Sequence, residues 1–416
     1  MGKMKDSGIE WIGEIPDDWK EIPNRYLFID HSKKVGDKAD EFQLLSLTTS
    51  GVKIKDLTAI GGKVPESYEN YQTVEKGDMV FCLFDLDCSA VFAGLSNYNG
   101  MITSAYDVLK PNSKYLFDLF VDYYFQYVFS NRYYKMYSKN IRYTITTDMF
   151  RSLLSLVPPI DVQYKIGNKL LKQNTKIDRL IINQQAQIEK LKEYKQSVIT
   201  EAVTKGLDSS VPMKPSGVEW IGEVPNSWQI IRGKNILTLL NKHVLPTDNV
   251  ITCFRDGEVT LRSNRREEGF TFSEKEIGYQ GVDVGDLIVH GMDGFAGAIG
   301  ISDSRGKASP VLIVLNSTQN KRYLMFYLRS IAYRDIFLAL STGIRVRSCD
   351  LRWNKLSVLP FLVPSLKEQD EIVAYIDHKL REIDKLISVK QQKIEKLNEY
   401  KKSLIYEYVT GKKEVG

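Results

Sequence analysis

Two stretches of the chain, each some 40 residues long, repeat apolar residues at alternating spacings of three and four. This period of 3.5 residues indicates the seam of a coiled coil. We therefore predict two long helices, over 160–206 and 361–412. The apolar positions are Ile177, Ile181, Ile188, Leu191 and Val198 in the first stretch, and Ile383, Ile387, Ile394, Leu397 and Leu404 in the second. At four positions of this pattern, which we call polar steps, a polar residue replaces the apolar one: Gln184, Lys195, Lys390 and Lys401.

Each predicted helix has a single apolar stripe, which would face water if the helix stood alone. Two such helices in one chain can cover each other's stripes, so we expect them to pair within the molecule. Pairing between two copies of the chain is the alternative that the pattern leaves open. At 1.5 Å per residue, each helix would span roughly 60 Å.

The residues before each long helix show a different pattern. They contain alternating or short apolar runs, such as DMVFCLF and GDLIVHG, between Gly and Asn turns, which predicts strands. Each body also holds one amphipathic stretch that predicts a helix, from Leu116 in the first and from Tyr323 in the second. The glycine-rich GMDGFAGAIG from Gly291 lacks dinucleotide-binding spacing, and we interpret it as a turn between strands. Each body is thus a predicted α+β domain.

The chain contains an internal duplication. Ser7 begins SGIEWIGEIPDDW, and 209 residues later Ser216 begins SGVEWIGEVPNSW. Ile188 begins IEKLKEYKQS, and 206 residues later Ile394 begins IEKLNEYKKS. A period near 200 residues is too long for a solenoid and indicates a duplicated domain. The predicted order is a body with its signature segment (1–159), a helix (160–206), a linker with the repeated signature (207–228), a second body (229–360) and a second helix (361–412).

Composition narrows the class of protein. With 416 residues and 43% hydrophobic content, the chain suits a globular protein of more than one domain. The beginning of the sequence lacks the apolar region of a signal peptide, and we expect a cytoplasmic protein with no membrane span. The net charge of +5 permits a nucleic-acid partner without requiring one.

Motifs for catalysis are missing from the sequence. There is no GxxxxGK[ST] phosphate loop and no Asn-Pro-Pro-aromatic motif of methyl transfer. The four histidines are scattered, and the four cysteines form no CxxC pair at zinc-ligand spacing. We therefore expect neither a metal site nor a catalytic site.

Local charge is more informative than the total. Residues 130–151 have a balance of +4 and residues 321–355 a balance of +6, at equivalent places in the two copies. In each, a short loop (SKNIRYTITTD or STGIRVRSCD) mixes Arg with the polar residues that contact phosphates and base edges. A single surface Arg is more often solvated or ion-paired, so the prediction depends on both clusters together. The candidate DNA-binding residues are Lys139, Arg142, Tyr143, Thr144, Arg345, Arg347 and Arg352.

Three motifs, each present twice, resemble the HsdS family, the specificity subunits of type I restriction-modification systems. They are SGxEWIGExPxxW, an apolar run ending in proline before each helix (LLSLVPP, KLSVLP), and IEKLxEYKxSxI. The resemblance covers essentially the whole chain. It implies two target-recognition domains, separated by two long antiparallel helices, that read the halves of an asymmetric bipartite site in double-stranded DNA. It also implies a non-catalytic chain whose partners bind S-adenosylmethionine, ATP and Mg²⁺.

The same resemblance implies that the helices dock two methyltransferase subunits, with restriction subunits joining further out. Residues kept in both helix copies are the candidates: Glu189, Lys190, Glu193, Tyr194 and Ser197, and Glu395, Lys396, Glu399, Tyr400 and Ser403. One departure from the family concerns the Pro-x-x-Glu-Gln start of the helix. The second copy keeps it partly as LKEQDEI, whereas the first copy, IDVQYKI, keeps only Gln163.

Two other classes of function are compatible with parts of this pattern. A coiled-coil scaffold or adaptor without DNA readout would explain the helices but not the matched basic clusters. An enzyme that acts on DNA by itself would need the catalytic motifs that the sequence lacks.

Overall fold

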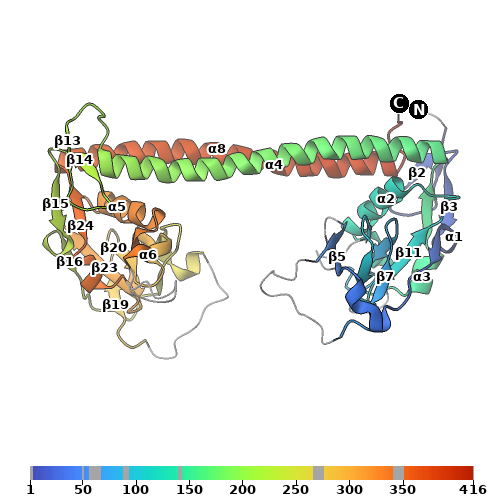
Figure 1. Ribbon diagram of the computed structural model, residues 1–416, viewed down its shortest axis with the longest axis horizontal. Coiled ribbons are helices and arrows are strands. Elements are labelled where there is room, and N and C mark those ends of the chain that lie inside the picture. The colour runs from blue at the N-terminus through green and yellow to red at the C-terminus, as the bar shows by residue number, and fades with distance from the viewer. Residues whose placement is uncertain are drawn as a thin grey trace. The chain divides into compact units, whose positions relative to one another are not determined.

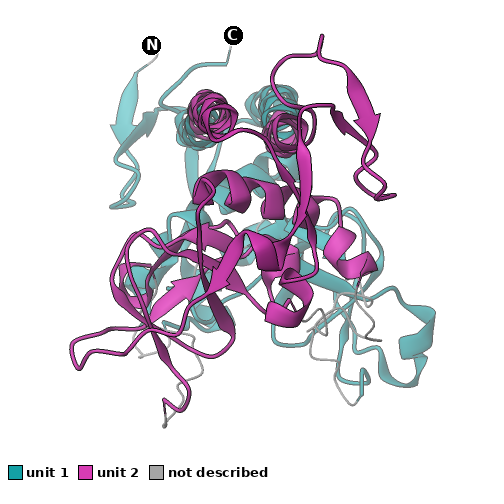
Figure 2. Ribbon diagram, turned by 90° about the vertical axis from the view of Figure 1, so that its left-hand side faces the viewer, with its two compact units in different colours: residues 1–184, 392–416 teal, residues 185–391 magenta. Residues whose placement is uncertain are grey.

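The computed structural model describes residues 3–48, 51–55, 67–87, 93–138, 143–265, 276–340 and 351–415. The chain forms two compact units: residues 1–184 with 392–416 make unit 1, and residues 185–391 make unit 2. Each unit combines a mixed body with one segment of each of two long helices, α4 (Ile160–Lys205) and α8 (Leu366–Val409) (Figure 2). The predicted α+β class with two long helices is confirmed.

In unit 1 the body is built from a four-stranded antiparallel sheet, several two-stranded sheets and short helices. The sheet has the order β4-β11-β8-β9. The strands are β1 (Met4–Asp6), β2 (Glu14–Pro16), β3 (Lys20–Pro23), β4 (Phe28–Asp30), β5 (Leu45–Thr48), β6 (Gly51–Ile54), β7 (Gln72–Val74), β8 (Met79–Phe81), β9 (Ala93–Leu95), β10 (Gly100–Ile102), β11 (Asp107–Pro111) and β12 (Leu154–Val157). The helices are α1 (Asn24–Leu27), α2 (Asp118–Ser130) and α3 (Thr147–Ser152), with 3-10 turns η1 (Gly36–Glu41) and η2 (Tyr133–Tyr137).

In unit 2 the body has the same plan, and its sheet has the order β16-β23-β20-β21. The strands are β13 (Met213–Pro215), β14 (Glu223–Pro225), β15 (Gln229–Arg232), β16 (Leu237–Leu239), β17 (Ile251–Cys253), β18 (Val259–Leu261), β19 (Gln280–Val282), β20 (Leu287–His290), β21 (Ile299–Ile301), β22 (Gly306–Ala308), β23 (Leu312–Ser317) and β24 (Pro360–Val363). The helices are α5 (Lys321–Tyr333), α6 (Ile336–Ala339) and α7 (Trp353–Leu356), with 3-10 turns η3 (Gly233–Asn235), η4 (Arg262–Asn264) and η5 (Gly294–Ala296).

The two bodies share one topology although their sequences have diverged. The four-stranded sheets correspond strand by strand, and each two-stranded pair of unit 1, such as β3 with β12, matches one of unit 2, such as β15 with β24. The signature segments form the hairpins β1-β2 and β13-β14. As predicted, DMVFCLF and GDLIVHG contribute strands, and GMDGFAGAIG forms the turn between β20 and β21.

In each body one helix packs over the sheet, and the apolar side chains between helix and sheet form the core. In unit 1 the ring of Phe125 on α2 packs edge-on against Phe81 of β8, with 5.1 Å between the ring centres. In unit 2 two buried tyrosines of α5 tie the helix to β24: Tyr323 Oη donates to the carbonyl of Leu362 (3.0 Å) and Tyr327 Oη to that of Pro360 (2.7 Å). Buried tyrosine hydroxyls need such acceptors, so these bonds fix the helix over the strand.

The amphipathic stretches predicted as single helices are each broken once, which corrects the sequence interpretation. α2 ends at Ser130 and is followed by η2, and α5 ends at Tyr333 and is followed by α6. The break falls at Arg132 (φ +58°) in unit 1 and at Asp335 (φ +54°) in unit 2. A left-handed residue cannot continue a right-handed helix. The side-chain pattern continues across the break, so hydrophobic periodicity did not reveal it.

Within each unit the segments of α4 and α8 pack side by side and antiparallel (Figure 1). In unit 1 the Lys401 ammonium lies 2.7 Å from the Asp178 carboxylate. In unit 2 the Lys195 ammonium lies 2.7 Å from the Asp384 carboxylate. Both pairs have the same register, because Lys195 lies 17 residues after Asp178 on α4 and its partner Asp384 lies 17 residues before Lys401 on α8. Two of the four polar steps of the predicted seam, Lys195 and Lys401, therefore form ion pairs across the helix pair.

A buried glutamine ties the start of each long helix to its body. Gln163 and Gln369 are both 0% exposed. Gln163 accepts from the backbone N–H of Phe117, at the start of α2 (2.9 Å), and donates to the carbonyls of Tyr115 and Pro158 (both 2.8 Å). Gln369 accepts from the N–H of Asn320, at the start of α5 (2.9 Å), and donates to Pro364 and Gln319. The residue that both copies keep is thus a structural clamp.

We expect Gln163→Ala and Gln369→Ala each to lower the free energy of unfolding by about 2–4 kcal/mol. Each change leaves buried backbone groups without their partners, and such groups cost about 1–3 kcal/mol apiece. Urea unfolding followed by circular dichroism measures the loss. Gln392→Ala in unit 1 and Gln391→Ala in unit 2, exposed positions on α8, are the matched controls. Equal stability of clamp and control variants would contradict the clamp.

A second prediction concerns acidity in unit 1. Burial raises the pKa of Asp122 to about 6, although its carboxylate accepts from Leu95 N–H (2.9 Å) and from Gln126 (2.7 Å). When folding raises the pKa of a carboxyl group, the folded protein is more stable with that group protonated. The free energy of unfolding therefore falls as pH rises from about 4 to about 6. At 1.36 kcal/mol per unit the loss is up to about 3 kcal/mol. Asp122→Asn should remove this part of the pH dependence in denaturation curves measured from pH 4 to 7, and an unchanged profile would refute it.

Candidate nucleic-acid interface and docking helices

The basic loops leave and rejoin the two bodies at equivalent places. In unit 1 the loop follows η2 and precedes α3, and in unit 2 it follows α6 and precedes α7. Four of the candidate DNA-binding residues, Lys139, Arg142, Arg345 and Arg347, lie outside the described residues. Tyr143, Thr144 and Arg352 are described, and they belong to the segments by which the loops rejoin the bodies.

One hydrogen bond anchors the loop return in the same way in both copies. In unit 1 the N–H of Ile145 donates to the carbonyl of Leu83, just after β8 (2.9 Å). In unit 2 the N–H of Leu351 donates to the carbonyl of Gly291, just after β20 (2.9 Å). Ile145 and Leu351 are both buried. The frame that presents the two loops is therefore the same, down to a backbone contact between segments far apart in sequence.

In unit 1 the loop return is further fixed through Tyr143. Its backbone is left-handed (φ +45°), and its carbonyl accepts from the N–H of Leu86 (3.2 Å). The ammonium of Lys135 lies 3.9 Å from the centre of its ring, within the range of a cation–π contact. A non-glycine residue in this conformation costs free energy and persists where surrounding contacts enforce it. Tyr143 thus acts as an anchor at the base of the loop.

In unit 2 Arg352 lies at the far end of the loop, at the N-cap of α7, and it is exposed. The turn that anchors Leu351 adds polar groups that the sequence analysis did not single out. Arg255 pairs with Asp293 (2.9 Å), and His290 Nδ1 accepts from the N–H of Asp293 (3.0 Å). Burial lowers the pKa of His290, which suits this acceptor role. Arg255 lies 96 residues before Leu351 in the sequence, so no local motif marks it.

Several cations in the predicted basic clusters are bonded within their own unit, which corrects the charge estimate. Arg151 pairs with Asp30. Arg322 pairs with Asp377 (2.6 Å), and Arg334 donates to the carbonyl of Trp220 (2.6 Å). These side chains stabilise the bodies, and the net charges of +4 and +6 therefore overstate what the clusters offer to a ligand. The prediction of DNA contact therefore depends on the Lys and Arg residues within the loops.

The seam positions of the long helices are all shielded from solvent to some degree. Ile177, Ile188, Val198, Ile383 and Leu404 are buried, and Ile181, Leu191, Ile387, Ile394 and Leu397 are half-buried. In unit 1, Ile177 and Leu404 belong to one apolar cluster with the core of the body. The seam therefore merges with the body core, which explains why it needs no partner molecule along this segment.

The candidate docking residues lie on the opposite, solvent-facing side. Glu189, Lys190, Glu193, Tyr194, Ser197, Glu395, Lys396, Glu399, Tyr400 and Ser403 are all exposed. Tyr194 in unit 2 and Tyr400 in unit 1 are each 53% exposed. In unit 2, Glu193 and Ser197 also line a depression of about 480 Å³ against Tyr333 and Arg334. Each unit thus presents one copy of this face.

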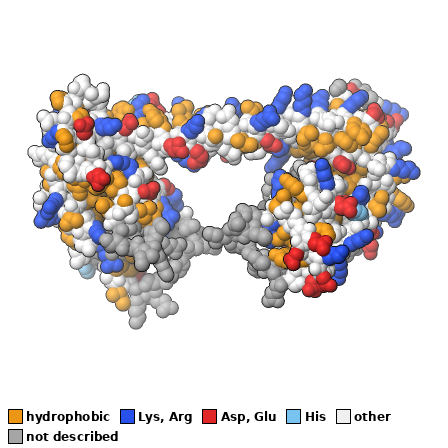
Figure 3. Space-filling model, in the orientation of Figure 1, with side chains coloured by type: hydrophobic (Ala, Val, Ile, Leu, Met, Phe, Trp, Pro, Cys, Tyr) orange, Lys and Arg blue, Asp and Glu red, His pale blue; other side chains and the backbone are white. Residues whose placement is uncertain are grey.

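The outer helix faces differ in charge between the units. On the α4 segment of unit 1, Lys165, Lys172, Lys176 and Arg179 form an exposed stripe at steps of three, four and seven. Lys and Arg side chains gather along this part of the helix pair (Figure 3). The corresponding positions on α8, 206 residues later, are Glu371, His378, Glu382 and Lys385. The basic stripe therefore belongs to one unit and not to the repeated frame.

Neither a metal centre nor a membrane segment is found in the part of the chain that the structure describes. Among these residues no group of three or more His, Cys, Asp or Glu side chains is placed to hold a metal ion. None of the described helices combines the length and apolar character that a membrane span requires.

No protein-family model matches the chain. Among solved structures, a chain of a type I R-M system, from work on its complex assembly and conformational transition, matches with a TM-score of 0.68 and 12% identity, over 95% of this chain and 98% of that chain. The HsdS subunit from Thermoanaerobacter tengcongensis matches with a TM-score of 0.50 and 13% identity over the same shares. At such identities the likeness shows the fold alone: the chain has the fold of the HsdS subunit from T. tengcongensis and of the matched type I R-M system chain.

Proposed function

We propose that the chain is the DNA specificity subunit of a type I restriction-modification system and that it reads an asymmetric, bipartite site in double-stranded DNA. The observation that carries the proposal is the pair of basic loops, each held by the same backbone hydrogen bond (Ile145 to Leu83, Leu351 to Gly291) on bodies of one topology. The fold shared with the HsdS subunit from T. tengcongensis supports it.

The chemistry of the loops fits base readout. Arg donates two parallel hydrogen bonds to guanine in the major groove, and Ser, Thr and Asn bond to phosphates or base edges. The loops differ in sequence, SKNIRYTITTD against STGIRVRSCD, while their anchors coincide. Two different readers on one frame would recognise two different half-sites, so the proposed target is not a palindrome.

The helices supply the proposed contacts to partners. The repeated exposed face around Tyr194 and Tyr400 would dock one methyltransferase subunit in each unit, and restriction subunits would join further out. The chain itself would be non-catalytic, with S-adenosylmethionine, ATP and Mg²⁺ bound by the partners. A scaffold without DNA readout is the alternative, and it predicts no salt-sensitive DNA binding. Methylome sequencing of cells that carry this chain with its methyltransferase would identify the site and decide between the two.

The loop arginines generate a prediction on specificity. Arg142→Ala should weaken recognition of one half-site by about 1–3 kcal/mol, and Arg345→Ala or Arg347→Ala should do so for the other half-site. Filter binding of the assembled methyltransferase to DNAs with one half-site randomised measures this. Arg381→Ala, an exposed position on α8, is the control. Equal losses on specific and random DNA would instead make these residues phosphate contacts.

The repeated tyrosines generate a prediction on assembly. Tyr194→Asp and Tyr400→Asp should each remove one bound methyltransferase subunit, and the double variant should remove both, because a charge replaces an apolar contact in each face. Light scattering after size-exclusion chromatography gives the stoichiometry. Tyr26→Asp, at a side chain of similar exposure (55%) on the body of unit 1, should still bind two. A folded double variant that binds two subunits would refute this docking face.

A further inference from the structure

Both signature segments end in a tryptophan that packs under the end of a long helix. Trp228 is 0% exposed, and its indole Nε1 donates to Glu368 Oε1 in the first turn of α8 (2.8 Å). Gly206, which ends α4 with φ +76°, lies against Trp228 and Pro225. In unit 2 the indole N–H therefore has a carboxylate acceptor that the chain itself provides.

Unit 1 has the same frame without the acceptor. Gly411, which ends α8 with φ +71°, lies against Pro16 and Trp19. Trp19 is 3% exposed. Val162 stands 206 residues before Glu368, at the matching position in the first turn of α4. Trp19 Nε1 makes no hydrogen bond with any residue that the structure describes.

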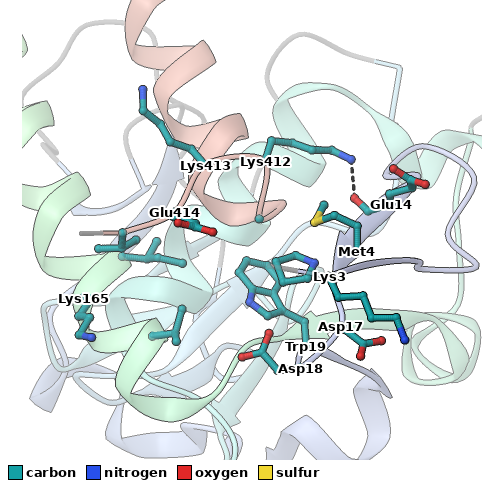
Figure 4. A pocket seen from close by; sticks show the side chains of 15 residues that line it. Lys3, Met4, Glu14, Asp17, Asp18, Trp19, Lys165, Lys412, Lys413 and Glu414 are labelled. Atoms are coloured by element: carbon teal, nitrogen blue, oxygen red, sulfur yellow. Dashed lines mark hydrogen bonds between the residues drawn. The ribbon is translucent and has the colours of Figure 1, made fainter. Parts of the chain in front are cut away.

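A pocket of about 770 Å³ opens at this point, entirely within unit 1. Trp19 and Val162 line it together with Ile166 of α4 and the segment from Gly411 to Val415 (Figure 4). Volumes of about 300–1,000 Å³ are usual for sites that bind small molecules or a partner's side chains. In unit 2 the Glu368 carboxylate accepts the Trp228 indole N–H. At the matching place in unit 1 there is a pocket, lined by the nearly buried Trp19, whose indole N–H has no acceptor among the described residues.

The charges around the pocket do not select a ligand by themselves. Four lysines and four acidic residues line it. Two of the lysines are engaged: Lys412 donates to the carbonyl of Glu14, and Lys413 pairs with Glu407 (2.8 Å). Figure 4 shows Lys412 reaching toward Glu14. The indole N–H and the apolar wall of Val162 and Ile166 therefore determine what fits: an acceptor at the end of an apolar stem.

We propose that this pocket binds a carboxylate on an apolar stem, of the kind that a glutamate side chain carries, and that its oxygen accepts the Trp19 indole N–H as Glu368 accepts that of Trp228. The proposal is independent of DNA recognition. The carboxylate can come from a free carboxylic acid or from an acidic side chain of a docked subunit, and the two sources share this chemistry.

The test follows the five indole N–H signals of the full chain, labelled with ¹⁵N at tryptophan, by NMR. Trp19→Phe identifies the Trp19 signal. One arm adds N-acetylglutamate amide, with N-acetylleucine amide as the control without a carboxylate. The other arm adds the purified methyltransferase subunit. We expect a saturable downfield shift of the Trp19 signal in at least one arm, since a hydrogen bond to a carboxylate deshields the indole proton.

Two variants calibrate the result. Val162→Glu places in unit 1 the acceptor that unit 2 has, so its Trp19 signal should lie downfield already and should no longer respond. Glu368→Val should move the Trp228 signal upfield, which checks that the carboxylate causes the shift. A response to the free glutamate derivative assigns the site to small carboxylates, and a response to the subunit alone assigns it to a docked side chain. A Trp19 signal that moves in neither arm overturns the proposal, whatever the chain does with DNA.

Discussion

The structure depends on the burial of one apolar stripe along each long helix. A helix of this length with a single stripe gains little by standing alone, because most helical stability comes from packing of the apolar face. In each unit a segment of the other copy's helix covers the apolar stripe, so residues 1–184 and 392–416 together form unit 1. Burying a side chain such as Ile177 or Leu404 contributes about 1.5–3 kcal/mol relative to exposure. Neither copy of the duplicated module therefore forms its unit from its own residues alone.

Polar contacts convert this apolar pairing into a defined arrangement. Lys401 with Asp178, and Lys195 with Asp384, fix the register within each pair, because a shifted register would leave charges against apolar positions. The side chains of Gln163 and Gln369 then join each helix to its body by hydrogen bonds to specific backbone groups. In unit 1 the long helix and the loop base belong to one packed core, because Ile177 of α4 lies in the apolar cluster against which Tyr143 packs.

Sequence periodicity identified the elements that depend on local patterning. The long helices, the strands of DMVFCLF and GDLIVHG, and the turn at Gly291 are found where the pattern placed them, except that α8 begins at Leu366, five residues after the predicted start at 361, because Pro360–Val363 form β24. It failed where a single backbone angle decides the structure, as at Arg132 and Asp335, since side-chain polarity continues unbroken across those residues. It also overstated the basic clusters, because a charge count cannot tell a free Arg from Arg334, which is bonded to the carbonyl of Trp220.

The sequence by itself determined that the chain is a duplicated α+β module with two long helices, because repeats and hydrophobic periods are properties of the linear order. The tertiary structure alone decided which helix segments join which body, how Gln163 and Gln369 are used, and that the loop returns share one anchoring bond. It also revealed the difference between Trp228, whose N–H meets Glu368, and Trp19, whose N–H faces a pocket. These features depend on contacts between distant residues, from 46 positions apart for Phe117 and Gln163 to 223 for Asp178 and Lys401, and no local pattern encodes which distant group will meet a given side chain.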